Sequence, residues 1–354
     1  MNTEKGIILE ILTDACRAPS GDNTQPWRFQ VRGNTIRVFN VSENDTSLFN
    51  WNQISNHIAL GGAIENICVS ARGRGYETVI SYFPDKQNSL LVASVELSKS
   101  DSVSEELASF ISARATNRKK YFAKEIEPEK LSELENLAAS SNERIVLLSG
   151  KEKTRELARI VSAGEKLALE DESIHDFLFS HVTWNREEDF HKHGFLIDTF
   201  EFSPPQKAVF RLLRNWKLLK FLLPLGISDF IARDMQKVHA TAPTFGAIVL
   251  SGSRPEDYVR GGMLMERLWL VATKLGLSLQ PATTVGIIGT HVVTGEPVSL
   301  SPVHQDLLRK EYANLSRQFG VRESERFAFV FRIGYADAPS AMTTRAEPKV
   351  TFED

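Results

Sequence analysis

Two long helical segments of the chain carry the same residues at the same intervals. The matching positions are Gly61, Glu65, Ala71 and Gly75 in the first segment and Gly262, Glu266, Ala272 and Gly276 in the second. Both segments have apolar residues at helical spacing and end at a glycine. Two amphipathic helices can match by chance, but here the order of the neighbouring elements also agrees. The repeat therefore predicts two diverged halves, residues 1–110 and 111–354.

The rest of the hydrophobic pattern predicts a mixture of helices and strands in each half. Expected helices are Ile7–Arg17, Ile58–Arg74, Glu105–Ala113, Glu129–Ala139 and Gly261–Leu275, and expected strands are Arg28–Val31, Thr35–Val41, Thr78–Phe83, Leu90–Leu97, Arg144–Leu148, Phe245–Leu250 and Phe327–Gly334. Residues 151–240 are almost entirely helical in pattern, and the tail through Arg345 is polar. We expect an α+β fold, with a mostly antiparallel sheet in each half packed by helices and with one core shared by the halves.

Composition excludes several classes of protein. The 354 residues are 42% hydrophobic and carry a formal net charge of −3, so no overall positive field indicates nucleic-acid binding. The first residues lack the basic start and cleavage site of a signal peptide, and no apolar run reaches the length of a membrane span. Cys16 and Cys68 both lie in apolar helical patterns, which is typical of buried free thiols in a reducing compartment. We therefore expect a cytoplasmic protein.

A polar loop stands between the first predicted helix and the first predicted strand. Residues 18–27 read Ala-Pro-Ser-Gly-Asp-Asn-Thr-Gln-Pro-Trp. Backbone N–H groups, small hydroxyls and amides gathered at one point can hold a planar polar ligand or an anion. Pro-Ser-Gly-Asp alone is more often an ordinary turn, and the main role expected for Trp27 is core packing.

A second polar segment follows the helix predicted near residue 105. Arg114-Ala115-Thr116-Asn117-Arg118 puts two guanidinium groups and a hydroxyl within five residues. Such a set can make charge-assisted hydrogen bonds to a phosphate. Taken alone, basic residues at a helix end are usually a solvated cap.

Together the two segments resemble the flavin-dependent nitroreductase superfamily. That family carries a Pro-Ser-x-x-Asn-x-Gln-Pro-Trp loop that touches FMN, and it opens with Arg-x-Ser-x-Arg or Arg-x-Ser-x-Lys. The resemblance implies that Pro19, Ser20, Gly21, Asn23 and Gln25 contact FMN. It also implies that Arg114, Thr116 and Arg118 bind its phosphate and the pyrimidine side of its ring, with Thr replacing the family's Ser.

Two further segments match the family in order and context. The family places a proline after its second long helix, where backbone groups line the flavin near N5, and Pro281, Ala282 and Thr283 match that position. Its C-terminal basic residue, which closes on the phosphate, matches Arg345. This last match is the weakest, because Arg345 lies in a polar tail.

The distribution of the motifs is unusual for the family. Ordinary members are homodimers in which every subunit carries both motifs. Here only the first half has the 19–27 loop, and only the second half has residues 114–118, so the halves complement each other. The chain therefore resembles the Acg-like branch, a single-chain pseudo-dimer, and we expect one FMN per chain. The pseudo-dimer is monomeric or pairs further as a homodimer.

The resemblance implies an FMN-dependent oxidoreductase that passes a hydride between NAD(P)H, flavin N5 and a small organic substrate. The cofactor supplies the chemistry, so no side chain is predicted as a general acid or base. Two alternatives remain open at this point. One is a protein that stores or sequesters FMN under a lid, and the other is a flavin-dependent dehydrogenase of a natural-product intermediate.

Residues 184–239 interrupt the second half. Ser203-Pro204-Pro205 is a good helix start, and the pattern predicts one basic amphipathic helix over 204–223. Such a helix either covers an active site as a lid or lies on a membrane surface. The lid is favoured, because related proteins carry helical insertions over the flavin. His191 and His193 have a spacing compatible with a metal site on a strand, but without further ligands nearby a solvated pair is expected.

Overall fold

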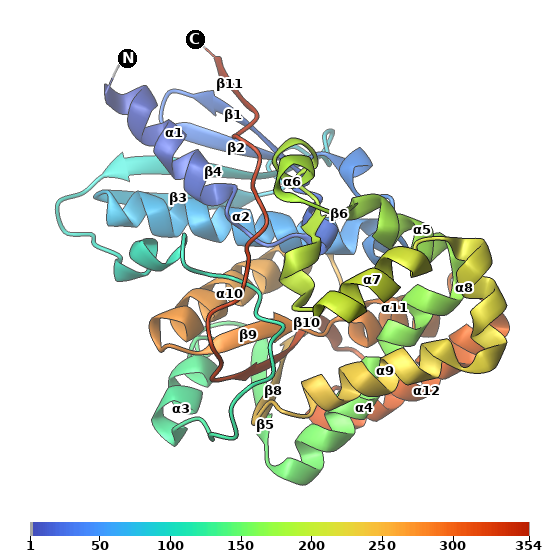
Figure 1. The fold of residues 1–354 in the computed structure, drawn as a ribbon. Helices are drawn as coiled ribbons and strands as arrows, with labels where there is room; N and C mark the ends of the chain where they lie inside the picture. Colours follow the sequence, from blue (N-terminus) through green and yellow to red (C-terminus); the bar gives the residue numbers. More distant parts are fainter. Residues whose placement is uncertain (1–2, 354) are drawn as a thin grey trace.

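The computed structural model describes residues 3–353 and shows two sheets with a pair of long helices between them (Figure 1). The first half contains α1 Thr3–Ala15, β1 Trp27–Arg32, β2 Thr35–Asn40, α2 Ile54–Gly73, β3 Tyr76–Tyr82 and β4 Leu91–Lys99, with short 3-10 turns η1 Gly21–Asn23, η2 Ser42–Asn44, η3 Leu48–Gln53 and η4 Glu106–Phe110. The expected helices and strands over residues 1–100 are confirmed, with ends that differ by a few residues.

The second half is longer and mostly helical. It contains α3 Pro128–Asn136, β5 Arg144–Ser149, α4 Lys151–Glu170, α5 Glu172–His181, β6 Val182–Thr183, α6 Arg186–Lys192, β7 Phe195–Leu196, η5 Ile197–Phe200, α7 Pro204–Leu213, α8 Trp216–Leu222, η6 Leu223–Leu225, α9 Ile227–His239, β8 Thr244–Leu250, α10 Pro255–Lys274, β9 Ser278–Pro281, α11 Thr284–Thr294, α12 Pro302–Phe319, β10 Arg326–Gly334 and β11 Val350–Glu353. The helices α11 and α12 and the strands β9 and β11 were not predicted from the pattern.

Each half has a mostly antiparallel sheet, which confirms the expected α+β fold. The first sheet has the order β11-β1-β2-β4-β3, and only its β1–β11 pair is parallel. The second has the order β5-β8-β10-β9 and is antiparallel throughout. A two-residue turn at Gly33 and Asn34 joins β1 to β2, and Gly33 has the positive φ of 55° that such hairpin turns require.

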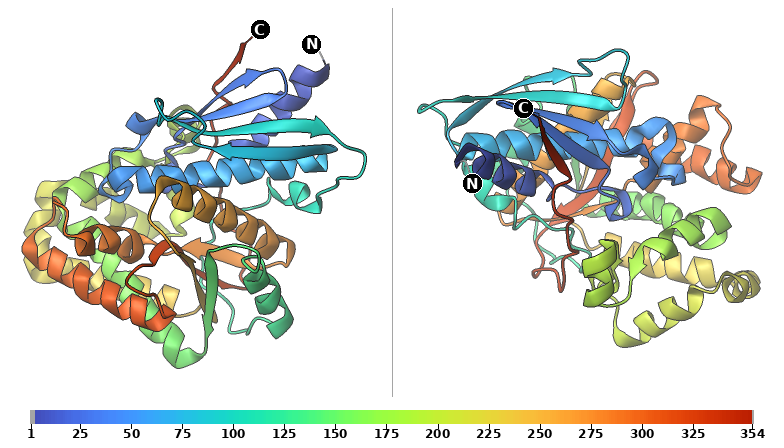
Figure 2. Two further views of the ribbon diagram at one scale, coloured as in Figure 1. Left: turned by 180° about the vertical axis from the view of Figure 1, so that it is seen from behind. Right: turned by 90° about the horizontal axis from the view of Figure 1, so that it is seen from above.

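The helices α2 and α10 pack against each other between the two sheets, as the left view of Figure 2 shows. A Cβ on Gly61 would lie 2.1 Å from the carbonyl oxygen of Val259, and a Cβ on Gly262 would lie 2.0 Å from that of Ile58. Ile58 and Val259 occupy equivalent places in the two helices. The repeated glycines therefore mark one close, reciprocal helix contact.

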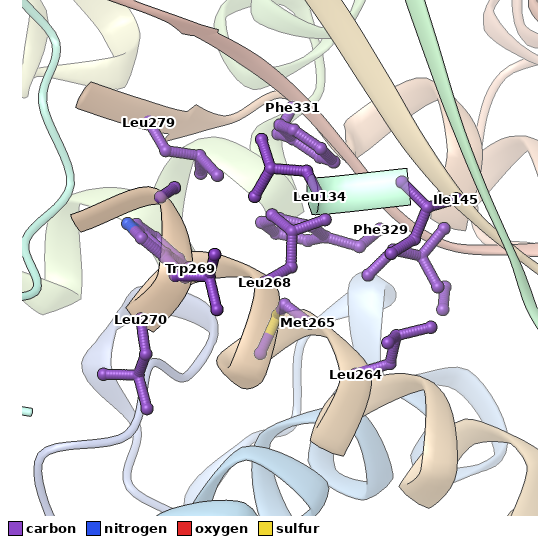
Figure 3. Packing of buried hydrophobic residues seen from close by; sticks show 14 of the residues in the cluster. Leu134, Ile145, Leu264, Met265, Leu268, Trp269, Leu270, Leu279, Phe329 and Phe331 are labelled. Carbon is purple, nitrogen blue, oxygen red and sulfur yellow. The ribbon is translucent and has the colours of Figure 1, made fainter. Parts of the chain in front are cut away.

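The apolar core continues from this helix pair into both sheets. Figure 3 shows part of it, where Leu264, Leu268 and Trp269 of α10 meet Phe329 and Phe331 of β10. The same cluster includes Ile54 and Ile58 of α2, and the cluster under the first sheet includes Val259 of α10. Each cluster thus draws side chains from both halves, as the expected shared core requires. Trp27, Cys16 and Cys68 are buried, and both cysteines are free, as expected.

The C-terminal segment crosses from the second half to the first. After β10 the chain runs across the molecule, and β11 adds a strand to the first sheet by pairing with β1 (Figure 1). The backbone N–H of Phe29 also donates to the carbonyl of Lys349 over 2.8 Å. This crossing carries Arg345 past the end of α1, where the predicted loop begins.

Two local predictions were wrong. The segment Glu105–Ala113 forms only the 3-10 turn η4, because a stretch this short takes its shape from packing, here against α2 and α10. The run 204–223 forms two helices instead of one, because Asn215 caps α8 by accepting from the N–H of Leu218. His191 and His193, for which a solvated pair was predicted, lie at the C-terminal end of α6, and His191 is exposed.

The insertion forms a helical layer at one side of the molecule (Figures 1 and 2). Its own small core contains Leu213 and Leu219, packed on Leu169 and Phe179 of α4 and α5. Ser203 and Gln206 form a capping box at the start of α7, as the predicted helix start implied. Among the helices of residues 3–353, none combines the length and the hydropathy needed to cross a bilayer.

Candidate functional site

The polar loop after α1 has an unusual backbone. Asp22, Asn23 and Gln25 have φ values of 47°, 59° and 48°, in the left-handed region that residues other than glycine seldom adopt. The Ser20 hydroxyl accepts a hydrogen bond from the Gln25 backbone N–H over 3.0 Å and helps to fix this turn. Each such residue raises the free energy of the folded state by about 1 kcal/mol or more. Three of them lie within four positions, so contacts with the surrounding structure must hold the loop in this conformation.

Those contacts come from two distant segments. The Asn23 amide donates to the carbonyls of Gly194 and Thr344, at 3.2 and 3.1 Å, and also to that of His193. The Gln25 side chain accepts from the backbone N–H of Ala346 over 2.9 Å. Gln25 is thus buried as a clamp on the C-terminal segment and does not line the cavity described below. Pro19, Ser20, Gly21 and Asn23 do line it.

Arg114 is held in place by three partners. Its Nε lies 3.0 Å from Oε1 of the buried Glu266, its Nη2 donates to the carbonyl of Arg17, and its guanidinium lies 4.7 Å from the ring centroid of Trp269. Burial raises the pKa of Glu266, while the charge of Arg114 lowers it. The ion pair fixes Arg114 at the junction of α1 and α10.

Arg345 completes a cluster of cations at this junction. Its Nη1 donates to the Thr343 hydroxyl over 2.6 Å, and its buried Nε has no acceptor among the described residues. The pKa of the Arg345 guanidinium is lowered to about 9, by burial first and then by the neighbouring cations Arg114 and Arg17. Glu266 offsets only part of this repulsion. The three guanidinium groups line one small cavity of about 80 Å³ that also has the hydroxyls of Ser20, Ser112 and Thr116.

A larger cavity of about 330 Å³ opens beside the first and shares residues with it. The shared residues are Pro19, Ser20, Thr116, Arg118 and Phe195. Its volume falls in the range of small-molecule sites, and side chains from α2, α4, α5 and α10 form its walls. The two cavities therefore form one continuous site at the seam between the halves.

Pro281, Ala282 and Thr283 line the larger cavity, as their place after the second long helix predicted. Pro281 ends β9, and the backbone N–H of Ala282 donates to the carbonyl of Val330 over 2.7 Å. The neighbouring strand β9 also orders the basic segment, because Thr116 bridges to Leu279 and the Asn117 N–H donates to the Leu279 carbonyl.

Arg118 points from this segment into the shared part of the site. Its Nη1 donates to the carbonyl of Thr199 over 3.2 Å, and its guanidinium lies 5.2 and 5.4 Å from the ring centroids of Phe195 and Phe200. Burial lowers the pKa of Arg118. The insertion thus reaches the site through residues 193–200, while its longer helices α7 and α8 lie farther out.

The equivalent position at the other seam is occupied differently. Glu65, the counterpart of Glu266, pairs with Arg267 of α10 over 2.6 Å, and Arg267 lies 3.4 Å from Glu105. The Tyr82 hydroxyl contacts the Met263 sulfur at 3.2 Å on the same side. The two seams therefore share a buried glutamate, but only one of them carries both predicted loops.

Sequence comparisons identify relatives of the chain. No protein-family model matches it. It is 23% identical over 337 residues, 94% of its length, to the "Uncharacterized protein MT1398" of Mycobacterium tuberculosis (strain CDC 1551 / Oshkosh), of which the match covers 46%. It is 29% identical over 178 residues, 49% of its length, to the "Putative NAD(P)H nitroreductase acg" of the same strain, of which the match covers 53%. The chain spans about half the length of these relatives.

The chain is similar to this nitroreductase-like group. A third relative from the same strain, the "Putative NAD(P)H nitroreductase MT3217", is 30% identical over 118 residues, which are 32% of this chain and 34% of the relative. The similarity confirms the resemblance that the two motif loops predicted, at the level of sequence relationship.

Comparison with solved structures finds similar chains at low identity. An FMN-bound nitroreductase from Bacteroides fragilis is 14% identical, with a TM-score of 0.36, and the match covers 69% of this chain and 95% of that one. The nitroreductase NfnB from Mycobacterium smegmatis, in complex with NADPH, is 14% identical, with a TM-score of 0.38 and coverages of 68% and 94%.

Sequence reasoning missed several residues of the site. Arg17 is the last residue before the loop, and its basic side chain at the end of a helix was the available signal. Asp22 lies inside the loop that was singled out, but its carboxyl received no role. Asp45, Phe195 and Thr199 had no local signal, because only the folded chain brings them to the seam.

Proposed function

We propose that the chain is an FMN-dependent oxidoreductase that binds one FMN at the seam between its halves. The observation that carries this proposal is that residues 19–23 of the first half and Arg114, Thr116 and Arg118 of the second line one continuous site. Neither half supplies both sets. The sequence similarity to proteins named as NAD(P)H nitroreductases supports the same class of activity.

The residues present fit both ends of this cofactor. Arg17, Arg114 and Arg345 repel one another in the small cavity, and the buried Nε of Arg345 lacks an acceptor. A phosphate offers several anionic acceptor oxygens, so it would satisfy this Nε and offset the repulsion. The larger cavity has the aromatic and aliphatic walls that a planar ring requires, among them Trp269 and Ile287.

FMN supplies hydride transfer between a nicotinamide and a small organic substrate when it is bound. The residues of the chain bind the cofactor, orient it and shield it from water. Arg118 places a positive charge in the shared part of the site, where an attraction of about 4 kcal/mol acts on an anion at ~4 Å and an effective dielectric of ~20. The backbone at Pro281–Thr283 lines the opposite part, and Phe177, Phe195 and Phe200 exclude water.

Flavin content and anaerobic reduction test this proposal. Purified protein saturated with FMN should hold one flavin per chain, measured from the absorbance ratio of flavin to protein after gel filtration. Mixing with NADH or NADPH without oxygen should bleach the flavin band within seconds. A ratio near two would contradict the single seam site, and a protein that retains no flavin would contradict the proposed cofactor.

One observation favours storage of FMN as a second candidate. Phe195, Thr199 and Phe200 lie against Arg118 and between the two cavities, so the insertion covers the part of the site where a substrate would approach. A bound flavin that stays yellow in the presence of either dinucleotide, and is released slowly, would support storage over turnover.

A further inference from the structure

The Asp22 carboxyl lies at the wall of the larger cavity, inside the strained part of the motif loop. No hydrogen bond or ion pair to this carboxyl is found within residues 3–353. Its neighbours Ser20 and Asn23 are both tied down, as described above. The loop therefore holds an unpartnered acidic group against the space available to a substrate.

A second carboxyl reaches the same wall from another segment. Asp45 also lines the larger cavity, and its Oδ2 lies 3.6 Å from the position that a Cβ on Gly21 would take. In contrast to Asp22, it is held firmly, because its Oδ1 accepts from the backbone N–H of Ser47 over 2.9 Å and from the Ser47 hydroxyl over 2.6 Å. Hydrogen-bond donors stabilise the ionised form of a carboxyl, so Asp45, with two donors, holds a proton less readily than Asp22, with none.

The charges around Asp22 act in both directions. Burial raises the pKa of Asp22 to about 6; His181 of α5 opposes this rise, Asp45 adds to it, and Arg118 opposes it. Burial also raises the pKa of Asp45, and its hydrogen bonds with Ser47 counteract that. Glu165 lines the same cavity, 3.7 Å from the buried His239. Asp22 is the carboxyl that combines cavity access, an acidic neighbour and no donor.

We propose that Asp22 is the proton donor of this site, and that Asp45 is a positioning residue whose negative charge favours the protonated form of Asp22. The inference rests on the proposed redox function, and a conjugated carbonyl compound serves as the probe substrate that makes the proton transfer measurable. Bound FMN would supply the hydride that forms a C–H bond at the β-carbon of this probe, with a dihydronicotinamide as the reductant. The Asp22 O–H bond breaks as its proton joins the α-carbon, and water then reprotonates the carboxylate.

The test uses the FMN-loaded protein and the Asp22→Asn variant. Asparagine adopts the left-handed conformation readily, so this change removes the proton and keeps the loop. The enzyme is reduced with NADPH without oxygen and then mixed with 2-cyclohexen-1-one. At pH 5, where Asp22 is mostly protonated, reoxidation of the variant should be slower by roughly 10²- to 10⁴-fold, the usual contribution of a positioned acid. Reoxidation should fall far more than reduction by NADPH in Asp22→Asn, whereas the exposed-surface control Glu77→Gln should keep both rates and its flavin content.

The pH profile and a spectroscopic signal separate a proton donor from a structural residue. The wild-type reoxidation rate should fall as pH rises through the pKa of Asp22, because the donor is lost. In Asp45→Asn this fall in rate should occur at lower pH, since the negative charge that raises the pKa of Asp22 is removed. Infrared difference spectra of the holoprotein between pH 5 and pH 8 should show a carboxylic-acid carbonyl band that Asp22→Asn lacks.

Either of two results would overturn the proposal. One is an Asp22→Asn variant with wild-type reoxidation rate, pH profile and infrared bands; the other is a reduced wild-type enzyme that the enone does not reoxidise. In both cases bound flavin that NADPH still bleaches leaves the proposed redox function intact. Failure of that function would appear earlier, as absent flavin or absent bleaching.

Discussion

The close contact between α2 and α10 makes a quantitative prediction for Gly61→Ala. The new Cβ would lie 2.1 Å from the Val259 carbonyl oxygen, whereas such contacts are almost never below 3.0 Å, so the two helices must separate by roughly 0.9 Å. A backbone atom cannot turn aside as a side chain can. Overpacking of this kind costs about 3 kcal/mol, and alanine recovers about 1 kcal/mol of helix propensity, which leaves a net loss of about 2 kcal/mol.

Thermal unfolding measures this loss. For a chain of 354 residues about 2 kcal/mol corresponds to a drop of roughly 3 °C in the unfolding midpoint. Gly262→Ala should lose a similar amount, because its Cβ would lie 2.0 Å from the Ile58 carbonyl oxygen. Gly6→Ala is the matched control: it lies within α1 with nothing within 4 Å of its Cβ position, and it should gain about 0.5–1 kcal/mol.

The reasoning would be refuted if Gly61→Ala melted at or above the wild-type temperature, as Gly6→Ala should. A large loss in Gly61→Ala with none in Gly262→Ala would refute the reciprocal contact instead. In the variants that are destabilised, the flavin-to-protein ratio gives a second readout, since the proposed site lies on the seam that these helices form.

Three further predictions concern the site and the core. Arg345→Ala should weaken the binding of FMN by roughly 10-fold or more, measured by equilibrium dialysis, because one charge-assisted contact is lost. The apoprotein should be no less stable in thermal melting, because the repulsion between Arg345 and Arg114 is relieved. Phe195→Ala and Phe200→Ala should speed the association of FMN by opening the covered part of the site, and unchanged fluorescence-quenching rates would argue against a cover. Burial lowers the pKa of His57 from 6.5 to about 4, so the folded state binds fewer protons than the unfolded state between these two pH values. The folded state should therefore lose roughly 3 kcal/mol of stability as pH falls from about 6.5 to 4. Urea midpoints at pH 7 and pH 4 should show this loss in the wild type and lack it in His57→Phe.

Local patterns predicted the regular elements well where packing and periodicity agree. Both copies of the long helix were found from their spacing, because each carries apolar residues at helical intervals and ends at a glycine with positive φ, here Gly75 and Gly276. The strand β11 and the helix α11 were missed. The first pairs with a strand from the opposite end of the chain, and the second has a nearly continuous apolar sequence without helical contrast.

Sequence reasoning predicted the two polar loops of the candidate site and missed the residues that distant segments of the chain contribute. Residues 19–23 and 114–118 are short, polar and local, so sequence alone marked them. The prediction for Gln25 stays untested as a cofactor contact, and the structure uses its side chain to hold Ala346. The acidic pair of Asp22 and Asp45 could not be anticipated, because its chemistry depends on which of the two carboxyls the fold supplies with hydrogen-bond donors.

The sequence by itself determined the repeat, the class of fold and the two kinds of loop, since each depends on the order and spacing of nearby residues. Tertiary structure alone decided that the loops meet at one seam, that Arg345 crosses to it on the C-terminal segment, and that Phe195 and Thr199 cover it. The physical reason is that burial, charge pairing and access at the seam depend on contacts between residues far apart in the sequence. The hydrogen bond between Asn23 and Thr344 joins residues 321 positions apart, and such contacts exist only in the folded chain.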